Sequence, residues 1–132
     1  MSRKLIWRAG LLFGVLIAAG CRDEPAGPML VGGRDLDSWI RRLDDPDASK
    51  RREAVRKLGN AGDLAASTRA ALAKRLRDAD PRVRREAVFT LGKAADLSDA
   101  LVSELKTIQQ RDPNADVRAS AAQALAKTPR IE

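Results

Sequence analysis

The chain has 132 residues, enough for one domain, with a net charge of +7 and only 3% aromatic residues. A core supplied mainly by Leu, Ala and Val favours close helix packing over a β-sandwich or barrel. There is no His and Cys21 is the only cysteine, which excludes a disulfide within one chain and a Cys/His zinc site.

Part of the positive charge lies in the first eight residues, which contain Arg3, Lys4 and Arg8. Without them the chain carries 22 Lys and Arg against 18 Asp and Glu, a net charge of +4. The two signs are mixed along the chain, unlike in a dedicated nucleic-acid binder. We therefore expect no nucleic-acid partner.

Residues 1–20 have the pattern of a secretory signal peptide, with a basic start, the apolar run Ala9–Ala19 and Gly20 before Cys21. This run is shorter than the roughly 20 residues that span a bilayer, so we expect no permanent transmembrane helix. Residues 17–21 (IAAGC) resemble a bacterial lipobox, although residue 18 is alanine where leucine is usual. The resemblance implies that Cys21 becomes the lipid-modified N-terminus. The alternative is an ordinary signal peptide with an incidental cysteine.

A lipid on Cys21 would place the protein at the extracytoplasmic side of a bacterial envelope, because several acyl chains anchor a protein stably. Arg22 is not the aspartate that often signals retention in the inner membrane, which favours the outer membrane in a Gram-negative host. The segment 21–33 contains two Pro and three Gly and no helical period. We interpret it as the lipidated cysteine and a flexible tether.

From Arg34 onward the chain repeats. The block Glu53–Gly59 aligns with Glu86–Gly92 at an offset of 33, and Ser120–Ala126 follows at an offset of 34. An Asp-Pro pair precedes each block, and another apolar helical pattern precedes each pair. These patterns contain Trp39, Ile40 and Leu43, then Leu72 and Leu76, then Leu101, Leu105 and Ile108. The period predicts an all-α fold, an α-solenoid of about three helical hairpins with about six helices.

The stretch Asp80–Gly92, with the pattern Asp-Pro-x-Val-Arg-x-x-Ala-x-x-x-Leu-Gly, closely resembles HEAT repeats of the short bacterial kind. The third repeat has two extra residues in its turn, and Lys50 takes the valine position in the first. The resemblance implies a repeat domain over residues 34–128, with repeats at about 34–62, 66–95 and 98–128 and a tail at 129–132. Because this architecture mostly presents surfaces for binding, the resemblance predicts the fold more closely than the function.

In each predicted hairpin, the helix after the Asp-Pro pair is called the second helix, and we expect one of its faces to form the core. Its residues are Ala54, Val55 and Leu58, then Val83, Ala87, Val88 and Leu91, then Val117, Ala121, Ala122 and Leu125. Gly59 and Gly92 end their helices, where we expect left-handed caps.

Arg51, Arg84 and Arg118 follow the valine position of each repeat. The family resemblance implies that they pair with turn aspartates of their own or adjacent repeats, here Asp45, Asp80 and Asp112 or Asp116. We interpret these pairs as a structural ladder that fixes register rather than as a binding site.

The opposite face of the second helices is the candidate site. At 100° per residue, Arg85, Phe89 and Lys93 point away from the core of the second repeat. By resemblance the second helices line the concave side of the solenoid. The predicted partner-binding residues there are Arg52, Arg56, Arg85, Phe89, Lys93, Gln123 and Lys127. An exposed Phe among cations is a suitable contact anchor, although Phe89 packing against a neighbouring repeat is the alternative.

Trp39 lies on the core side of the first helix, where we expect it to cap the N-terminal end of the solenoid. Terminal repeats need a polar outer face, which Asp37, Arg41, Arg42 and Asp44 can supply.

The sequence contains no recognisable nucleophile–base pair or metal cluster. We therefore expect a protein that is not an enzyme and has no cofactor and no small-molecule substrate. The repeats and the lipobox together predict a lipid-anchored scaffold for an unidentified protein partner. Two alternatives are binding of a polyanion, either lipid headgroups or polysaccharide, by the basic face, and an accessory role in a lyase-type enzyme.

Overall fold

The computed structural model describes residues 30–62, 64–94 and 96–127. The predicted signal peptide, the lipidation site at Cys21, most of the tether and the tail at 129–132 lie outside these residues. No helix in the described part of the chain is long and apolar enough to cross a membrane.

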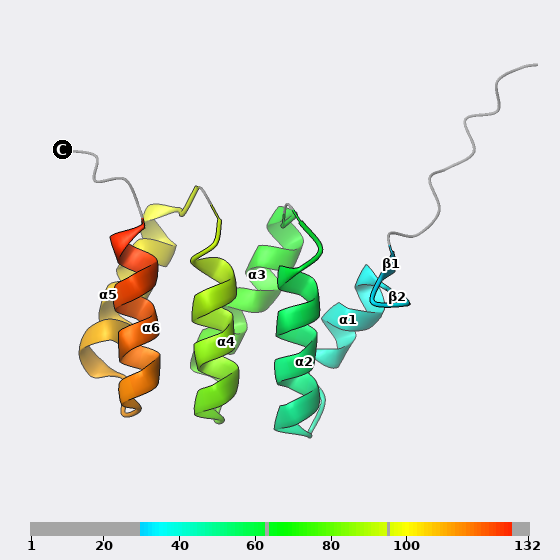
Figure 1. The fold of residues 1–132 in the computed structure, drawn as a ribbon, viewed down its shortest axis with the longest axis horizontal. Coiled ribbons are helices and arrows are strands. Elements are labelled where there is room, and N and C mark those ends of the chain that lie inside the picture. Colours follow the sequence, from blue (N-terminus) through cyan, green and yellow to red (C-terminus); the bar gives the residue numbers. More distant parts are fainter. Residues whose placement is uncertain (1–29, 63, 95, 128–132) are drawn as a thin grey trace, which may run out of the picture.

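In the described residues, helices form three successive hairpins. The first joins α1 (Leu36–Arg42) to α2 (Ala48–Gly59). The second joins α3 (Ala66–Lys74), extended by the 3-10 turn η1 (Arg75–Arg77), to α4 (Pro81–Leu91). The third joins α5 (Asp99–Arg111) to α6 (Ala115–Ala126). Figure 1 shows α2, α4 and α6 side by side in one layer, which confirms the predicted all-α solenoid.

Each second helix begins at a side-chain cap in its turn. Asp47, Asp80 and Asn114 accept a hydrogen bond from the backbone N–H two residues further on, at 2.8, 2.7 and 2.9 Å. Such caps satisfy N–H groups that have no partner within the helix. Pro81 follows its cap directly, where its missing N–H costs nothing.

The predicted core residues of α2 and α4 are buried, and nearly all are fully inaccessible. The third hairpin departs from the prediction, because Ala122 and Leu125 are only half-buried while Ala124 is 4% exposed. Since no described helix packs beyond α6, only the sides of α6 that face α4 and α5 are covered.

The prediction of left-handed caps at Gly59 and Gly92 is wrong. Gly92 has a φ of −69°, and Gly59 is the last residue of α2. A Cβ atom on Gly92 would lie 2.5 Å from the Cβ of Ala124, and one on Gly59 would lie 2.6 Å from the Cγ2 of Thr90. These glycines therefore allow neighbouring second helices to approach closely, and neither adopts a left-handed backbone conformation.

Residues 30–33, expected in the flexible tether, instead belong to a small antiparallel hairpin. Strand β1 (Leu30–Val31) pairs with β2 (Arg34–Asp35) across Gly32 and Gly33, whose φ values of 56° and 81° suit a two-residue turn.

Trp39 is 3% exposed, which confirms its predicted place in the core. Its indole N–H donates to the carbonyl of Val31 in the small hairpin at 2.6 Å. Arg34, Arg42 and Lys57 lie 5.7–5.9 Å from the ring centroid. The N-terminal end of the solenoid is thus closed by an aromatic ring covered with cations.

Candidate interaction surface

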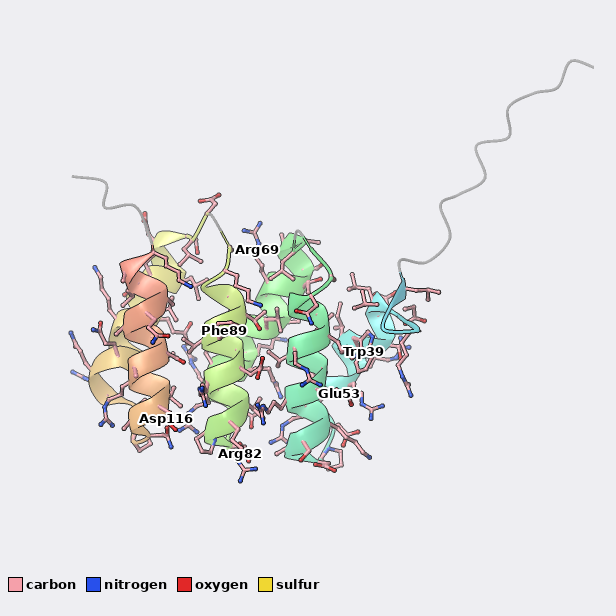
Figure 2. All side chains as sticks on the ribbon, viewed as in Figure 1. Trp39, Glu53, Arg69, Arg82, Phe89 and Asp116 are labelled. Atoms are coloured by element: carbon pink, nitrogen blue, oxygen red, sulfur yellow. The ribbon has the colours of Figure 1, made fainter. Side chains whose placement is uncertain are left out.

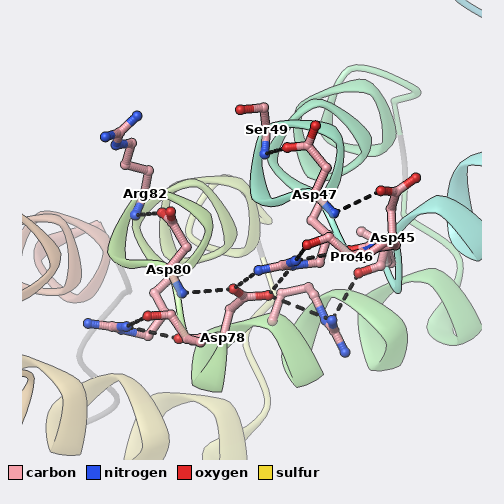
Figure 3. Close-up of polar contacts among 12 residues, drawn as sticks. Asp45, Pro46, Asp47, Ser49, Asp78, Asp80 and Arg82 are labelled. Carbon is pink, nitrogen blue, oxygen red and sulfur yellow. Dashed lines mark hydrogen bonds and ion pairs between the residues drawn. The ribbon is translucent and has the colours of Figure 1, made fainter.

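An arginine ladder joins the turns of successive hairpins, and Figure 3 shows the polar contacts around Asp78 between the first two turns. Arg51 donates through Nε and Nη2 to the carboxylate of Asp78 in the next hairpin, at 2.9 and 2.8 Å. Arg84 binds Asp112 in the same way, at 2.8 and 3.0 Å. Through Nη1, each arginine also donates to the backbone carbonyl of its own turn, Asp45 for Arg51 and Asp78 for Arg84. Each arginine therefore fixes one hairpin against the next.

The predicted partners of these arginines are partly wrong. Of the four aspartates named, only Asp112 receives the paired hydrogen bonds of an arginine fork. Asp80 caps α4, and Asp116 is the second residue of α6. The missing partner, Asp78, could have been found from its offset of 33 from Asp45 and 34 from Asp112.

The acceptors of the ladder are almost removed from solvent, with side-chain exposures of 3% for Asp78 and 6% for Asp112. Burial alone would raise their pKa values. The hydrogen bonds from Arg51 and Arg84, with those from backbone N–H groups, outweigh burial and lower the pKa of both carboxyls. The same bonds raise the pKa of Arg51 and Arg84. The ladder therefore stays charged at neutral pH, with its groups committed to structure.

All seven predicted site residues are exposed, and they lie on α2, α4 and α6 or just after them. We call Arg52, Arg56, Arg85, Phe89, Lys93, Gln123 and Lys127 the basic strip. Figure 2 shows Phe89 on α4, in the middle of the layer of second helices.

Phe89 does not pack into a neighbouring repeat. Its exposed fraction is 47%, and the ammonium nitrogen of Lys93 lies 4.5 Å from its ring centroid. At this distance a cation is attracted to the face of the ring. The structure thus presents an aromatic ring and a cation as one exposed unit near the C-terminal end of α4.

The cations of the basic strip differ in what they contact. Arg52 donates through Nε to Glu86 at 3.3 Å, linking α2 to α4. The side chains of Arg56, Arg85 and Lys127 have no hydrogen-bond or ion-pair partner among the described residues. These three cations are therefore available to an external group.

Two hollows lie along the seam between α2 and α4. One of about 190 Å³ is near the start of both helices, and another of about 560 Å³ is near their ends. The first is lined in part by Arg52 and Arg56 and the second by Lys93, so the basic strip borders both. No group of carboxylates or thiols suited to a metal ion occurs in the described ranges.

The sequence matches the HEAT repeats family over residues 36–126, which span the described helices from α1 to α6. The chain belongs to the HEAT-repeat family. HEAT repeats indicate a scaffold for protein–protein interaction, and a HEAT-repeat module is typically non-catalytic. No curated protein matches the chain.

Proposed function

We propose that this HEAT-repeat domain is a non-catalytic scaffold that binds a protein partner through the basic strip. The observation that carries the proposal is the exposed pair of Phe89 and Lys93, beside cations that have no partner in the described residues. The partner expected from this chemistry is an acidic segment with at least one apolar side chain.

The two parts of the basic strip have different roles in this proposal. Aromatic and arginine side chains supply much of the binding energy of protein interfaces when they become desolvated. An apolar group of the partner would cover the exposed part of the Phe89 ring and remove it from water, which favours binding. Arg56, Arg85 and Lys127 attract an acidic partner and favour its correct orientation.

The distribution of perturbed titratable groups supports a non-catalytic role. Catalytic acids and bases typically have shifted pKa values within a cleft. Arg51, Asp78, Arg84 and Asp112 have shifted pKa values, and all four belong to the ladder. They bind one another and line neither hollow beside the basic strip.

A charge-reversal experiment tests the proposal. The triple variant Arg56→Glu/Arg85→Glu/Lys127→Glu changes cations that have no described partner, so the fold should persist. The matched control is Lys74→Glu/Lys106→Glu/Arg111→Glu, which makes the same change of charge at exposed positions of the first helices. We expect proteins cross-linked to the wild type in intact cells to be recovered at least about tenfold less with the strip variant. Recovery should be unchanged with the control. Equal recovery with both variants would remove the basic strip from the proposal.

The same cations would also suit a polyanion such as lipid headgroups or a polysaccharide. Binding of a polyanion would weaken steeply with salt, because it rests on exposed charges. Phe89→Ser separates the two cases, since it removes the apolar anchor and leaves every cation in place. Loss of binding in this variant supports a protein partner, and unchanged binding with steep salt dependence supports the polyanion.

We further propose that a lipid on Cys21 holds the domain at the extracytoplasmic side of a bacterial envelope, in the outer membrane of a Gram-negative host. The support is the lipobox-like sequence before Cys21. Mass spectrometry of the mature N-terminus from the native host should detect an acylated Cys21. An intact Met1 or an unmodified Cys21 would refute the anchor.

A further inference from the structure

Among the residues that the structure describes, the arginine ladder is open at both ends of the solenoid, and we propose that a second copy of this chain closes it. Arg118 of one copy would bind Asp45 of the next, as Arg51 binds Asp78 and Arg84 binds Asp112 within one copy. The inference does not depend on the basic strip.

The donor end of the ladder is Arg118. It stands at an offset of 34 from Arg84 and makes the same bonds to its own turn, from Nη1 to the carbonyls of Asp112 and Pro113 at 2.8 and 3.3 Å. Its Nε and Nη2 have no partner in the part of the chain that the structure describes. Those are the two atoms that hold the next aspartate in Arg51 and Arg84.

The acceptor end is Asp45, at the repeat position of Asp78 and Asp112. Its Oδ1 accepts the N–H of Asp47 at 2.9 Å, just as Asp78 accepts that of Asp80 at 3.0 Å. No arginine fork reaches its carboxylate among the described residues, and the nearest cation is Lys50 at 3.9 Å. The side chain of Asp45 is 21% exposed, against 3% for Asp78. At the equivalent positions inside the solenoid, Arg51 and Arg84 of the preceding hairpin cover the carboxylates of Asp78 and Asp112, whereas no arginine covers that of Asp45 among the described residues.

The face of α6 beside Arg118 is also uncovered. In α4, Val88 and Gly92 follow Arg84 by one and two turns, and both are buried, Gly92 against Ala124 of α6. Their counterparts in α6 are Ala122, which is half-buried, and Ala126, which is exposed. Small side chains at these positions leave room for another helix to approach closely.

The guanidinium of Arg118 and the carboxylate of Asp45 are opposite in charge and lie at different ends of the solenoid, so the contact runs head to tail. Such a contact can propagate into a short row of molecules and does not close into a two-fold dimer. At the N-terminal end Lys57 occupies the position of Thr90, which limits the fit. We therefore expect a dissociation constant on the order of tens of micromolar.

Sedimentation velocity of the full chain in density-matched detergent tests the proposal. The sedimentation coefficient of the wild type should rise as the protein concentration passes through the expected dissociation constant. Asp45→Asn keeps an oxygen for the N–H of Asp47 and removes the charge, and Arg118→Gln removes the fork. Each variant alone should weaken association at least about tenfold. Lys74→Gln, which removes an exposed cation of α3 in the middle hairpin and outside the ladder, should behave as the wild type.

Mixing the two variants provides the decisive result. Asp45→Asn retains Arg118, and Arg118→Gln retains Asp45, so an equimolar mixture can form one native contact. We expect a one-to-one pair in the mixture and single molecules in each separate sample. Circular dichroism checks that both variants fold. If Arg118→Gln does not fold, the loss of association in Asp45→Asn still tests the proposal.

Three results would overturn the proposal. The first is a wild type that sediments as single molecules at every concentration. The second is that both variants associate as the wild type does. The third is a mixture that contains no pair. A chain ending at Lys127 is a further comparison. If only this shortened chain associates, the residues 128–132 occupy the face in place of a second copy.

Discussion

At the scale of single residues, the ion pair between Arg51 and Asp78 is a largely buried contact that joins two hairpins. The two side chains are 14% and 3% exposed, so solvent screens their attraction weakly. Removing one partner leaves the other charge buried without its counter-ion, which is costly, whereas exposed pairs contribute little. The ladder therefore contributes to stability as well as to register, which is more than we inferred from the sequence.

We predict that Asp78→Asn lowers the free energy of unfolding by about 2–3 kcal/mol at pH 7. Urea denaturation followed by circular dichroism measures this change. The control is Arg77→Gln, which breaks the pair with Glu104 from a side chain that is 82% exposed, and it should cost less than about 0.5 kcal/mol. Equal losses in the two variants would contradict the assigned role of Asp78.

The pH dependence of this loss follows from the lowered pKa of Asp78. Because its pKa is lower in the folded state than in the unfolded chain, its contribution is fully present above the unfolded value of about 3.9. The contribution is lost as the pH falls through the folded value. The difference in stability between the wild type and Asp78→Asn should therefore shrink below about pH 4. A difference that stays constant down to pH 2.5 would contradict this expectation.

At the scale of elements, the spacing of the second helices depends on the smallest side chains at their contacts. Gly92 lies against Ala124, and Gly59 lies against Thr90. The backbone of Gly92 has an ordinary helical conformation, so the glycine is needed for space and not for its conformational freedom.

We predict that Gly92→Ala destabilises the fold by about 1–3 kcal/mol, because the added methyl group would overlap the Cβ of Ala124. The double variant Gly92→Ala/Ala124→Gly returns the space to the other helix. The double variant should therefore lose less stability than the sum of the losses in the two single variants. A double-mutant cycle measures this coupling. Strict additivity of the two changes would show that Gly92 has another role.

At the scale of the whole molecule, each hairpin contacts only its neighbours, so stability should vary along the solenoid. The helix α4 packs against both α2 and α6, whereas α6 has a described second-helix neighbour on one side only. The N-terminal end has the cap formed by Trp39 and the hairpin of β1 and β2.

We predict that backbone amides of α4 exchange with deuterium most slowly and those of the α5–α6 hairpin fastest, at concentrations too low for association. Trp39→Ala should accelerate exchange in α1 and α2 more than in α6. Hydrogen exchange measured by mass spectrometry resolves these segments. Uniform exchange over all the helices would indicate a single cooperative unit.

The fold and the exposure of the basic strip were accessible from the sequence because both depend on local periodicity. The recurrence of 33–34 residues, with Asp-Pro before each second helix, determined the hairpins. The helical angle between Val83 and Phe89 then placed Phe89 on the outer face, where it is 47% exposed.

Contacts between repeats required the tertiary structure. The repeat offset marks Asp78 as the equivalent of Asp45 and Asp112, but its pairing with Arg51 of the preceding hairpin and the close approach at Gly92 depend on how separate segments meet. The bond from Trp39 to Val31, within the first repeat, also depends on how two segments meet. A local pattern gives the direction in which a side chain leaves its own helix, but not the distance to the neighbouring hairpin. The sequence by itself therefore determined which elements form and which faces are apolar. Only the tertiary structure decided which residues join the hairpins and which ends of the ladder stay open.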